Sequence, residues 1–262
     1  DRFYRLPLYL VAVFYKKNEL KMAGDIFSNN STGITAQDLS NKKEFCSFVY
    51  SNYLADNNRK IIFDKINNYK KVNSGGAYLN NIGYILENKL EFELKHKFSI
   101  AFENTSRSGY TTEKIVCSLA AKTIPIYWGN PDIGKEFNEK RFINCHNYES
   151  FEEVVERVKD VDNNNELYER IINEPWFAEG YGVNLVKDGF EFFLKNIFEQ
   201  PLWSARRMTE NSVKILELER YEKKIGQFVK IKAKFKMLLS KIYKPFKNFV
   251  FLEVLKQNYF KK

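Results

Sequence analysis

A loop of polar and charged side chains at residues 102–114 carries residue types that bind an anionic ligand. It reads Phe-Glu-Asn-Thr-Ser-Arg-Ser-Gly-Tyr-Thr-Thr-Glu-Lys and lies between an expected strand and the start of an expected helix. The first N–H groups of a helix have no intrahelical acceptor, and the helix dipole attracts negative charge there. The loop therefore predicts a phosphate group, and in particular a nucleotide, as its ligand.

Three side chains of this loop have candidate roles that follow from their type and place. Lys114, in the first helical turn, is mildly unfavourable against the dipole unless an anion compensates it, which a bound pyrophosphate would do. Glu113 agrees with the dipole, so it is either an ordinary acid at the helix start or an acceptor for sugar hydroxyls. Tyr110 offers a ring for stacking or a hydroxyl for a phosphate, or it serves packing alone.

The elements around the loop alternate between strand and helix. Continuous apolar strands separated by helices are typical of a parallel sheet covered on both faces, and such sheets bind nucleotides at the carboxyl ends of their strands. We therefore expect a doubly wound α/β domain at residues 43–200, with a turn at 73–76. Its strands are predicted at 45–50, 97–102, 123–128 and 142–145, and its helices at 59–69, 113–122, 149–160, 164–173 and 183–198.

Charge is distributed unevenly along the chain. The sequence holds 42 Lys and Arg against 33 Asp and Glu, a formal net charge of +9. Residues 221–262 hold 12 lysines against two glutamates and so carry +10, which leaves the rest of the chain close to neutral. A basic folded surface, the footprint of nucleic-acid binding, is not predicted. Residues 1–42 are interpreted as an interdomain segment or linker, and 201–262 as a helical tail.

The tail has a helical period as well as its charge. Apolar residues from Ile225 to Ile242 recur at helical spacing with lysines mostly opposite, and Pro245 is expected to interrupt the helix. A basic amphipathic helix of this kind binds anionic membrane surfaces, although it can also pack on another domain or subunit, or end as a solvated lysine-rich segment. The apolar run at residues 6–15 is about half the length of a membrane-spanning helix. We predict attachment of residues 221–262 to a membrane surface.

Several other patterns are interpreted as structural. No G-x-G-x-x-G or P-loop is present, which disfavours dinucleotide dehydrogenases and P-loop NTPases. Asp160-Val161-Asp162 has the D-x-D form of a metal-nucleotide site, but it closes an expected helix, so we interpret it as a solvated helix end and expect no obligatory metal. His96 is expected on the surface, and His146 is expected to be structural. The cysteines are expected to be reduced and buried, being far apart and odd in number: Cys46, Cys117 and Cys145.

Several separated motifs occur in an order that resembles the donor-binding part of glycosyltransferase family 10, the α-1,3-fucosyltransferases, in its bacterial form. They extend over residues 102–144, and residues 48–52 and Arg59 upstream also resemble the family. The motifs are Phe102-Glu103-Asn104-Thr105, Tyr110-x-Thr112-Glu113-Lys114, Ile124-Pro125-Ile126-Tyr127-Trp128-Gly129-Asn130-Pro131, Phe137-Asn138 and Phe142-Ile143-Asn144.

The resemblance implies a two-domain GT-B enzyme, of which this chain would be the Rossmann-like donor domain. By position, Arg59 and Lys114 would hold the pyrophosphate of GDP-fucose, and Asn104 and Tyr110 would line the donor pocket. Glu113 would bind hydroxyls of the ribose or fucose. Ser51 and Asn52 would lie at a strand end beneath the nucleotide.

The resemblance also implies inverting transfer of fucose to a GlcNAc-containing glycan acceptor, with an α-1,3 linkage and with no cofactor beyond the donor. The catalytic base would lie in an N-terminal acceptor domain that we expect these 262 residues not to include, so no base is assigned. A cytoplasmic location peripheral to the inner membrane is expected, and oligomers are possible. Two alternatives remain: a GT-B glycosyltransferase for another nucleotide sugar, and a nucleotide- or RNA-binding module with a basic tail.

Overall fold

The computed structural model describes residues 3–15, 34–201, 220–221 and 224–227. Contacts divide the chain after Asn196 into two units, and the first of them, Asp1–Asn196, contains the sheet and the predicted site. Most of the predicted membrane-binding tail lies outside the described residues. Among those that are described, no helix has the length and apolar character needed to cross a membrane.

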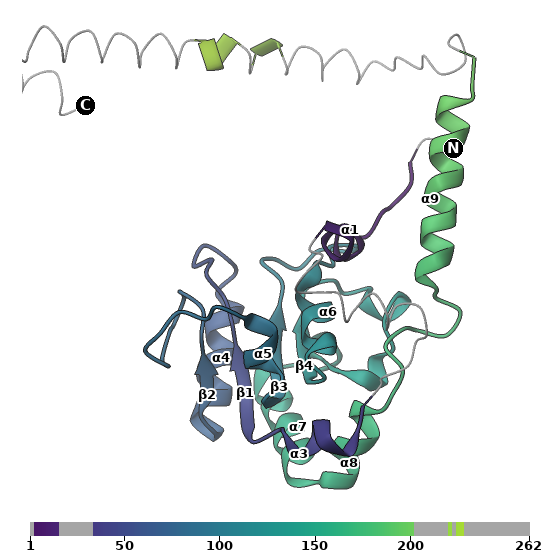
Figure 1. The fold of residues 1–262 in the computed structure, drawn as a ribbon. Helices are drawn as coiled ribbons and strands as arrows, with labels where there is room; N and C mark the ends of the chain where they lie inside the picture. Colours follow the sequence, from purple (N-terminus) through teal and green to yellow (C-terminus); the bar gives the residue numbers. More distant parts are fainter. Residues whose placement is uncertain (1–2, 16–33, 202–219, 222–223, 228–262) are drawn as a thin grey trace, which may run out of the picture. The chain divides into compact units, whose positions relative to one another are not determined.

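A parallel five-stranded sheet forms the centre of the first unit (Figure 1). The strand order is β2-β1-β3-β4-β5, which places β3 in the middle with parallel neighbours on both sides. The expected doubly wound α/β fold is confirmed. The strands are β1 (Glu44–Phe48), β2 (Val72–Ser74), β3 (His96–Phe102), β4 (Ile124–Trp128) and β5 (Ile143–Asn144).

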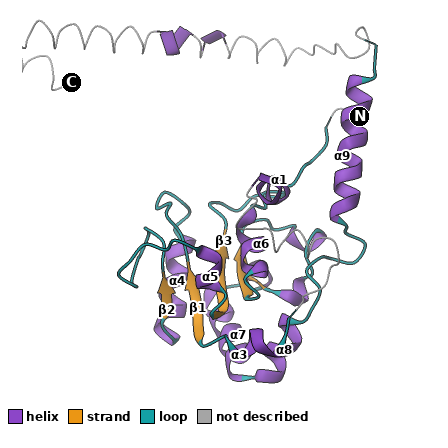
Figure 2. Cartoon of the chain, in the orientation of Figure 1, coloured by secondary structure: helices purple, strands orange, loops and turns teal. Residues whose placement is uncertain are grey.

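Helices connect the strands and cover both faces of the sheet (Figure 2). Side-chain caps begin several of them: Ser150, for example, accepts the Glu153 N–H, as expected where unpaired N–H groups start a helix. The α-helices are α1 (Leu8–Tyr15), α3 (Ala36–Ser40), α4 (Asn58–Tyr69), α5 (Lys89–Glu93), α6 (Glu113–Ala120), α7 (Phe151–Asn163), α8 (Asn165–Ile172) and α9 (Val183–Phe198). Short 3₁₀ turns follow at Ile133–Lys135, Glu139–Arg141 and Cys145–Asn147.

Two apolar clusters, one on each face of the sheet, hold these layers together. Alternation along the strands separates them: in β3, Phe98, Ile100 and Phe102 join α4, α7 and α8 in one cluster, whereas Ala101 joins α1 and α6 in the other. Tyr9 of α1 is fully buried in the second cluster. Since each face is closed by helices, the carboxyl edge of the sheet keeps a fixed geometry for the loops that carry the predicted site.

The structure differs from the sequence predictions mainly in short elements. The segment predicted as a turn at 73–76 begins within β2, whose three residues pair in parallel with β1. The five-residue helices α3 and α5 were not predicted. The expected strand at 142–145 is limited to the two residues of β5, followed by a 3₁₀ turn. Cys46 and Cys145 are buried as expected, and burial raises the pKa of both thiols, while Cys117 is half-buried.

The interpretation of residues 160–162 as a solvated helix end is wrong for Asp162. Its side chain is only 4% exposed, and it accepts from Lys97 Nζ at 2.7 Å and from Lys70 Nζ at 2.9 Å. Burial alone would raise the pKa of Asp162, but the hydrogen bonds from these two lysines outweigh it and lower the pKa. Asp162 therefore ties the end of α7 to the sheet.

The expectation that His96 lies on the surface is also wrong. His96 begins β3 and is 1% exposed, with Nδ1 2.8 Å from the Phe92 carbonyl oxygen and Nε2 3.1 Å from Asn73 Nδ2. Since a carbonyl can only accept, Nδ1 carries the proton and Nε2 accepts from the Asn73 amide. Burial lowers the pKa of His96 to about 4, so the folded protein holds a neutral ring.

Acidification is therefore expected to destabilise the fold through His96. Between about pH 6.5 and pH 4 the unfolded chain binds a proton at the His96 ring, whereas the folded state does not. The contribution of the neutral ring to stability therefore decreases as the pH falls, by roughly 2–3 kcal/mol at pH 4.5. Urea unfolding at pH 7 and pH 4.5 measures it. His96→Gln should flatten the dependence more than His146→Gln, whose ring is only half-buried. An unchanged slope in His96→Gln would contradict the assignment.

Candidate functional site

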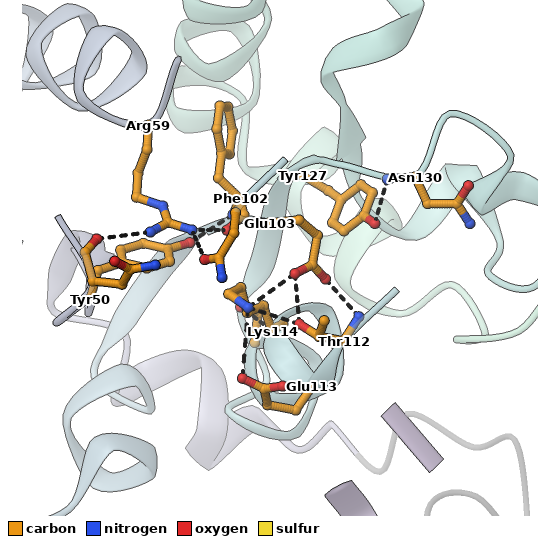
Figure 3. A network of polar contacts seen from close by, with 12 residues as sticks. Tyr50, Arg59, Phe102, Glu103, Thr112, Glu113, Lys114, Tyr127 and Asn130 are labelled. Carbon is orange, nitrogen blue, oxygen red and sulfur yellow. Dashed lines mark hydrogen bonds and ion pairs between the residues drawn. The ribbon is translucent and has the colours of Figure 1, made fainter. Parts of the chain in front are cut away.

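Three segments of the chain meet at the carboxyl ends of β1, β3 and β4, and the polar network there includes the predicted site residues Arg59, Glu113 and Lys114 (Figure 3). Residues 51–52 follow β1, residues 103–112 connect β3 to α6, and residues 129–130 follow β4. In a parallel sheet these ends lie at one edge, and the first turn of α6 begins there as well. The edge thus brings together backbone N–H groups and side chains from separate parts of the sequence.

Glu103 is the centre of this arrangement, although its side chain is fully buried. Its carboxylate accepts from the Thr112 N–H at 2.7 Å, from Thr112 Oγ1 at 2.6 Å and from Lys114 Nζ at 3.0 Å (Figure 3). Thr112 is the N-cap of α6, but its own hydroxyl makes no cap hydrogen bond. The carboxylate at the end of β3 therefore holds the start of α6, in place of a side-chain cap within the helix itself.

Lys114 lies in the first turn of α6, as expected, with 14% of its side chain exposed. Besides Glu103, its ammonium contacts Thr112 Oγ1 at 2.9 Å and Glu113 Oε1 at 3.8 Å. Glu103 thus supplies an anion that compensates a cation at a helix N-terminus, and a bound phosphate is not required to explain Lys114 there. Its predicted contact with a pyrophosphate stays a prediction.

Gly129 leaves the space that the Glu103 side chain occupies. A Cβ atom at position 129 would lie 2.4 Å from Glu103 Cγ and 3.0 Å from the Tyr127 hydroxyl oxygen. The backbone is aligned by a hydrogen bond from the Glu103 N–H to the Trp128 carbonyl at 2.8 Å. Any larger residue after β4 would therefore displace the carboxylate.

Arg59, from the first turn of α4, is 1% exposed and reaches the same edge. One guanidinium nitrogen donates to the Phe102 carbonyl at 3.0 Å and to Asn104 Oδ1 at 2.9 Å, and another to the Asn52 carbonyl at 3.3 Å. The guanidinium also lies over the ring of Tyr50, 4.0 Å from its centroid. These acceptors are all neutral, so the positive charge of Arg59 is held at the edge without a carboxylate among them.

Tyr50 supports Arg59 from below. Its hydroxyl donates to the Ile100 carbonyl and accepts from the Phe102 N–H, both at 2.7 Å. Burial raises the pKa of Tyr50, so the hydroxyl keeps its proton. The stacked pair therefore joins the ends of β1 and β3 beneath the loop.

The structure places the remaining predicted residues around this edge with different degrees of exposure. Ser51 and Asn52 are exposed, and Asn52 Oδ1 accepts the Leu54 N–H at 2.9 Å. Asn104 contacts Arg59, and Glu113 lies beside Lys114. Tyr110 is half-buried in the loop, with its N–H on the Arg107 carbonyl.

Two buried residues at this edge, Glu103 and Asn130, belong to the motifs that resemble the family, but the sequence alone indicates no role for either. Asn130 is fully buried; its Oδ1 accepts the Gly109 N–H at 2.8 Å, and its Nδ2 donates to Thr111 Oγ1 at 3.0 Å. A signal existed for Glu103, since an acid directly after a buried strand must find donors. Its donors, nine and eleven residues further along, are visible only in the folded chain.

His146 agrees with its structural interpretation. Its ring stacks on Trp128, and Nε2 lies 3.3 Å from both the N–H and the carbonyl of Gly129. Among the residues that the structure describes, no cluster of three or more His, Cys, Asp or Glu side chains could hold a metal ion. The expectation of a reaction without an obligatory metal stays a prediction.

Residues 39–184 match the family model for the C-terminal part of glycosyltransferase family 10 (fucosyltransferase). An α-(1,3)-fucosyltransferase of Helicobacter pylori is 31% identical over 83% of this chain and 52% of its own length. A crystal structure of an α1,3-fucosyltransferase with GDP-fucose matches 69% of this chain and 54% of that one, at a TM-score of 0.53 and 29% identity. A second α1,3-fucosyltransferase structure covers 74% of this chain at a TM-score of 0.59 and 28% identity. The chain spans about half the length of the H. pylori relative. It belongs to glycosyltransferase family 10, the fucosyltransferases.

Proposed function

We propose that this chain forms the GDP-fucose-binding half of an α-1,3-fucosyltransferase. The observation that carries the proposal is the pair of cations at the carboxyl edge of the sheet. Arg59 is held there by neutral acceptors, and Lys114 lies at the N-terminus of α6. The crystal structure of an α1,3-fucosyltransferase with GDP-fucose, to which this chain is similar, supports the same choice of ligand.

The chemistry of fucosyl transfer suits this edge. When GDP leaves the anomeric carbon, negative charge develops on its pyrophosphate, and fixed cations stabilise it without a proton transfer. Arg59 and Lys114 take this role, with the N–H groups of α6 as additional donors. Asn104 and Tyr110 line the pocket, Glu113 binds sugar hydroxyls, and Ser51 with Asn52 lies beneath the nucleotide.

The acceptor side of the reaction is proposed from the family alone. We infer an acceptor glycan that contains GlcNAc and an inverting transfer, in which a carboxylate removes the proton of the attacking hydroxyl from the face opposite GDP. Glu103 does not suit that role, because three donors occupy its buried carboxylate.

Membrane attachment of residues 221–262 also stays a prediction, which co-sedimentation with anionic vesicles before and after truncation at Arg220 can test.

Calorimetric titration of the 262-residue chain tests donor binding. GDP and GDP-fucose should bind, whereas UDP-sugars should bind at least tenfold more weakly, about 1.4 kcal/mol. Lys114→Ala removes a charge-assisted phosphate contact and should weaken GDP binding roughly 10- to 100-fold. The matched control is Lys159→Ala, an exchange of a surface lysine on α7 that pairs with Glu156. Equal GDP affinity in both lysine variants would place the phosphate elsewhere, and equal affinity for UDP-sugars would remove the donor assignment.

A further inference from the structure

A segment at the start of the described chain, residues 3–7, reaches the loop of the candidate site. Arg5 Nη2 donates to the Gly109 carbonyl at 2.9 Å and forms an ion pair with Glu136 Oε1 at 2.7 Å. The two contacts join residues 104 and 131 positions apart in the sequence. Arg5 therefore bridges the loop after β3 to the 3₁₀ turn after β4.

Both backbone groups of Gly109, its N–H and its carbonyl, are held by hydrogen bonds to side chains. Asn130 Oδ1 accepts the Gly109 N–H at 2.8 Å, while Arg5 binds the Gly109 carbonyl. Gly109 has φ +77°, and a Cβ atom there would lie 3.0 Å from Arg5 Nε. A glycine is required by both the conformation and the close approach of the guanidinium. The peptide bond that Arg5 fixes is the one that leads directly into Tyr110.

Arg5 is itself held in place by its surroundings. Glu136 is 4% exposed, so the carboxylate that orients the guanidinium is buried. The neighbouring Tyr4 donates from its hydroxyl to the Val186 carbonyl at 2.6 Å, and its ring packs against Phe190 and Phe193 of α9. A guanidinium fixed on both sides presents its donors to Gly109 at little further entropic cost.

We infer that Arg5 is a positioning residue of the candidate site, which acts on the nucleotide through the Gly109 peptide and Tyr110. The inference rests on the proposed function, because it requires that Tyr110 lines the donor pocket. Asn130, which follows β4, accepts the N–H of Gly109. Arg5 binds the carbonyl of Gly109 from a segment that is not part of the sheet. Nucleotide affinity thus depends on the docking of residues 3–7.

The inference predicts that loss of the Arg5 contact with Gly109 weakens nucleotide binding by the folded protein. Arg5 is 37% exposed but its partner Glu136 is buried, so Arg5→Ala leaves a buried carboxylate without its cation and should also lower the urea midpoint of unfolding. Without Arg5, the loop must in addition become ordered when the ligand binds, and that cost reduces affinity. Arg5→Ala should therefore weaken GDP binding by the folded protein about tenfold.

Titration calorimetry with GDP on the 262-residue chain provides the first test. Arg5→Lys keeps the charge beside Glu136 but lacks the fork that reaches Gly109, so it should recover only part of the affinity. Arg170→Ala, an exposed arginine of α8, is the matched control and should bind GDP like the unsubstituted chain. If Arg5→Ala binds GDP as tightly as the control, the positioning role is wrong.

A double-mutant cycle with Tyr110→Ala separates positioning from a general structural effect. If Arg5 acts through Tyr110, Arg5→Ala should cause less than a threefold further loss once Tyr110 is absent. The same tenfold loss in both backgrounds would overturn the inference. The two proposals fail in different ways: a chain that binds no GDP at all contradicts the proposed function, and this inference with it, whereas normal GDP binding by Arg5→Ala contradicts this inference alone.

Discussion

Glu103→Ala is expected to destabilise the fold by about 3–5 kcal/mol, because it removes one partner of a buried ion pair. The substitution leaves the Lys114 ammonium without its buried carboxylate, and it leaves the N–H and hydroxyl of Thr112 without their acceptor. The start of α6 loses its cap at the same time. Urea unfolding at pH 7 measures the loss, and GDP binding by the folded fraction should decrease with it.

Two further variants make this test specific. Glu103→Gln keeps the shape and an acceptor oxygen but not the charge, so its stability should lie between that of Glu103→Ala and the unsubstituted chain. Glu152→Ala removes an exposed carboxylate that pairs with Lys65 on the surface, and it should cost less than about 1 kcal/mol. If Glu103→Ala is as mild as Glu152→Ala, the buried carboxylate does not hold the site together.

Arg59→Ala is expected to reduce both stability and nucleotide affinity. It leaves a cavity under the loop, removes the stacking on Tyr50 and frees three acceptors at the ends of β1 and β3. Together these losses should cost about 3–5 kcal/mol of folding free energy, in the range of large buried side chains. GDP affinity of the folded variant should decrease at least tenfold if the cation also faces the pyrophosphate.

Arg59→Lys distinguishes charge from geometry in this prediction. A lysine keeps the positive charge, but its compact ammonium cannot span the acceptors that the planar guanidinium reaches. We expect less than half of the stability to be recovered, with a larger recovery of GDP affinity. A fully stable Arg59→Ala variant, compared with Arg170→Ala in the same urea series, would show that the contacts of the guanidinium do not support the fold.

The long elements of the fold were predictable because their signals are local. The apolar run at 97–102 and the helical period at 59–69 correspond to β3 and α4 within one residue at their starts. By contrast, β2 and the five-residue helices α3 and α5 are too short to carry a period, and contacts with the rest of the fold stabilise them. The prediction that His96 is exposed was wrong for a related reason. Its neighbours Lys95 and Lys97 suggest exposure, but the alternation of side chains along β3 directs the His96 ring into the fold.

The candidate site was predictable in its residue types more than in its contacts. Lys114 and Glu113 were assigned from their place at a helix start, and Arg59 and Asn104 from the family resemblance. The acceptors of Arg59 come from two separate segments, and the contact of Arg5 with Gly109 joins residues far apart in the sequence. Such pairings depend on the topology of the sheet, which a local pattern does not contain.

The capping of α6 by Glu103 also constrains the order in which this protein can fold. A helix with a local cap can form its first turn early, but the cap of α6 becomes available only when β3 is in place and the intervening loop has closed. The eight residues of α6 are too few to be stable alone in water. We therefore expect the central strand and the helix that follows it to form together, with the candidate site complete only once both are in place.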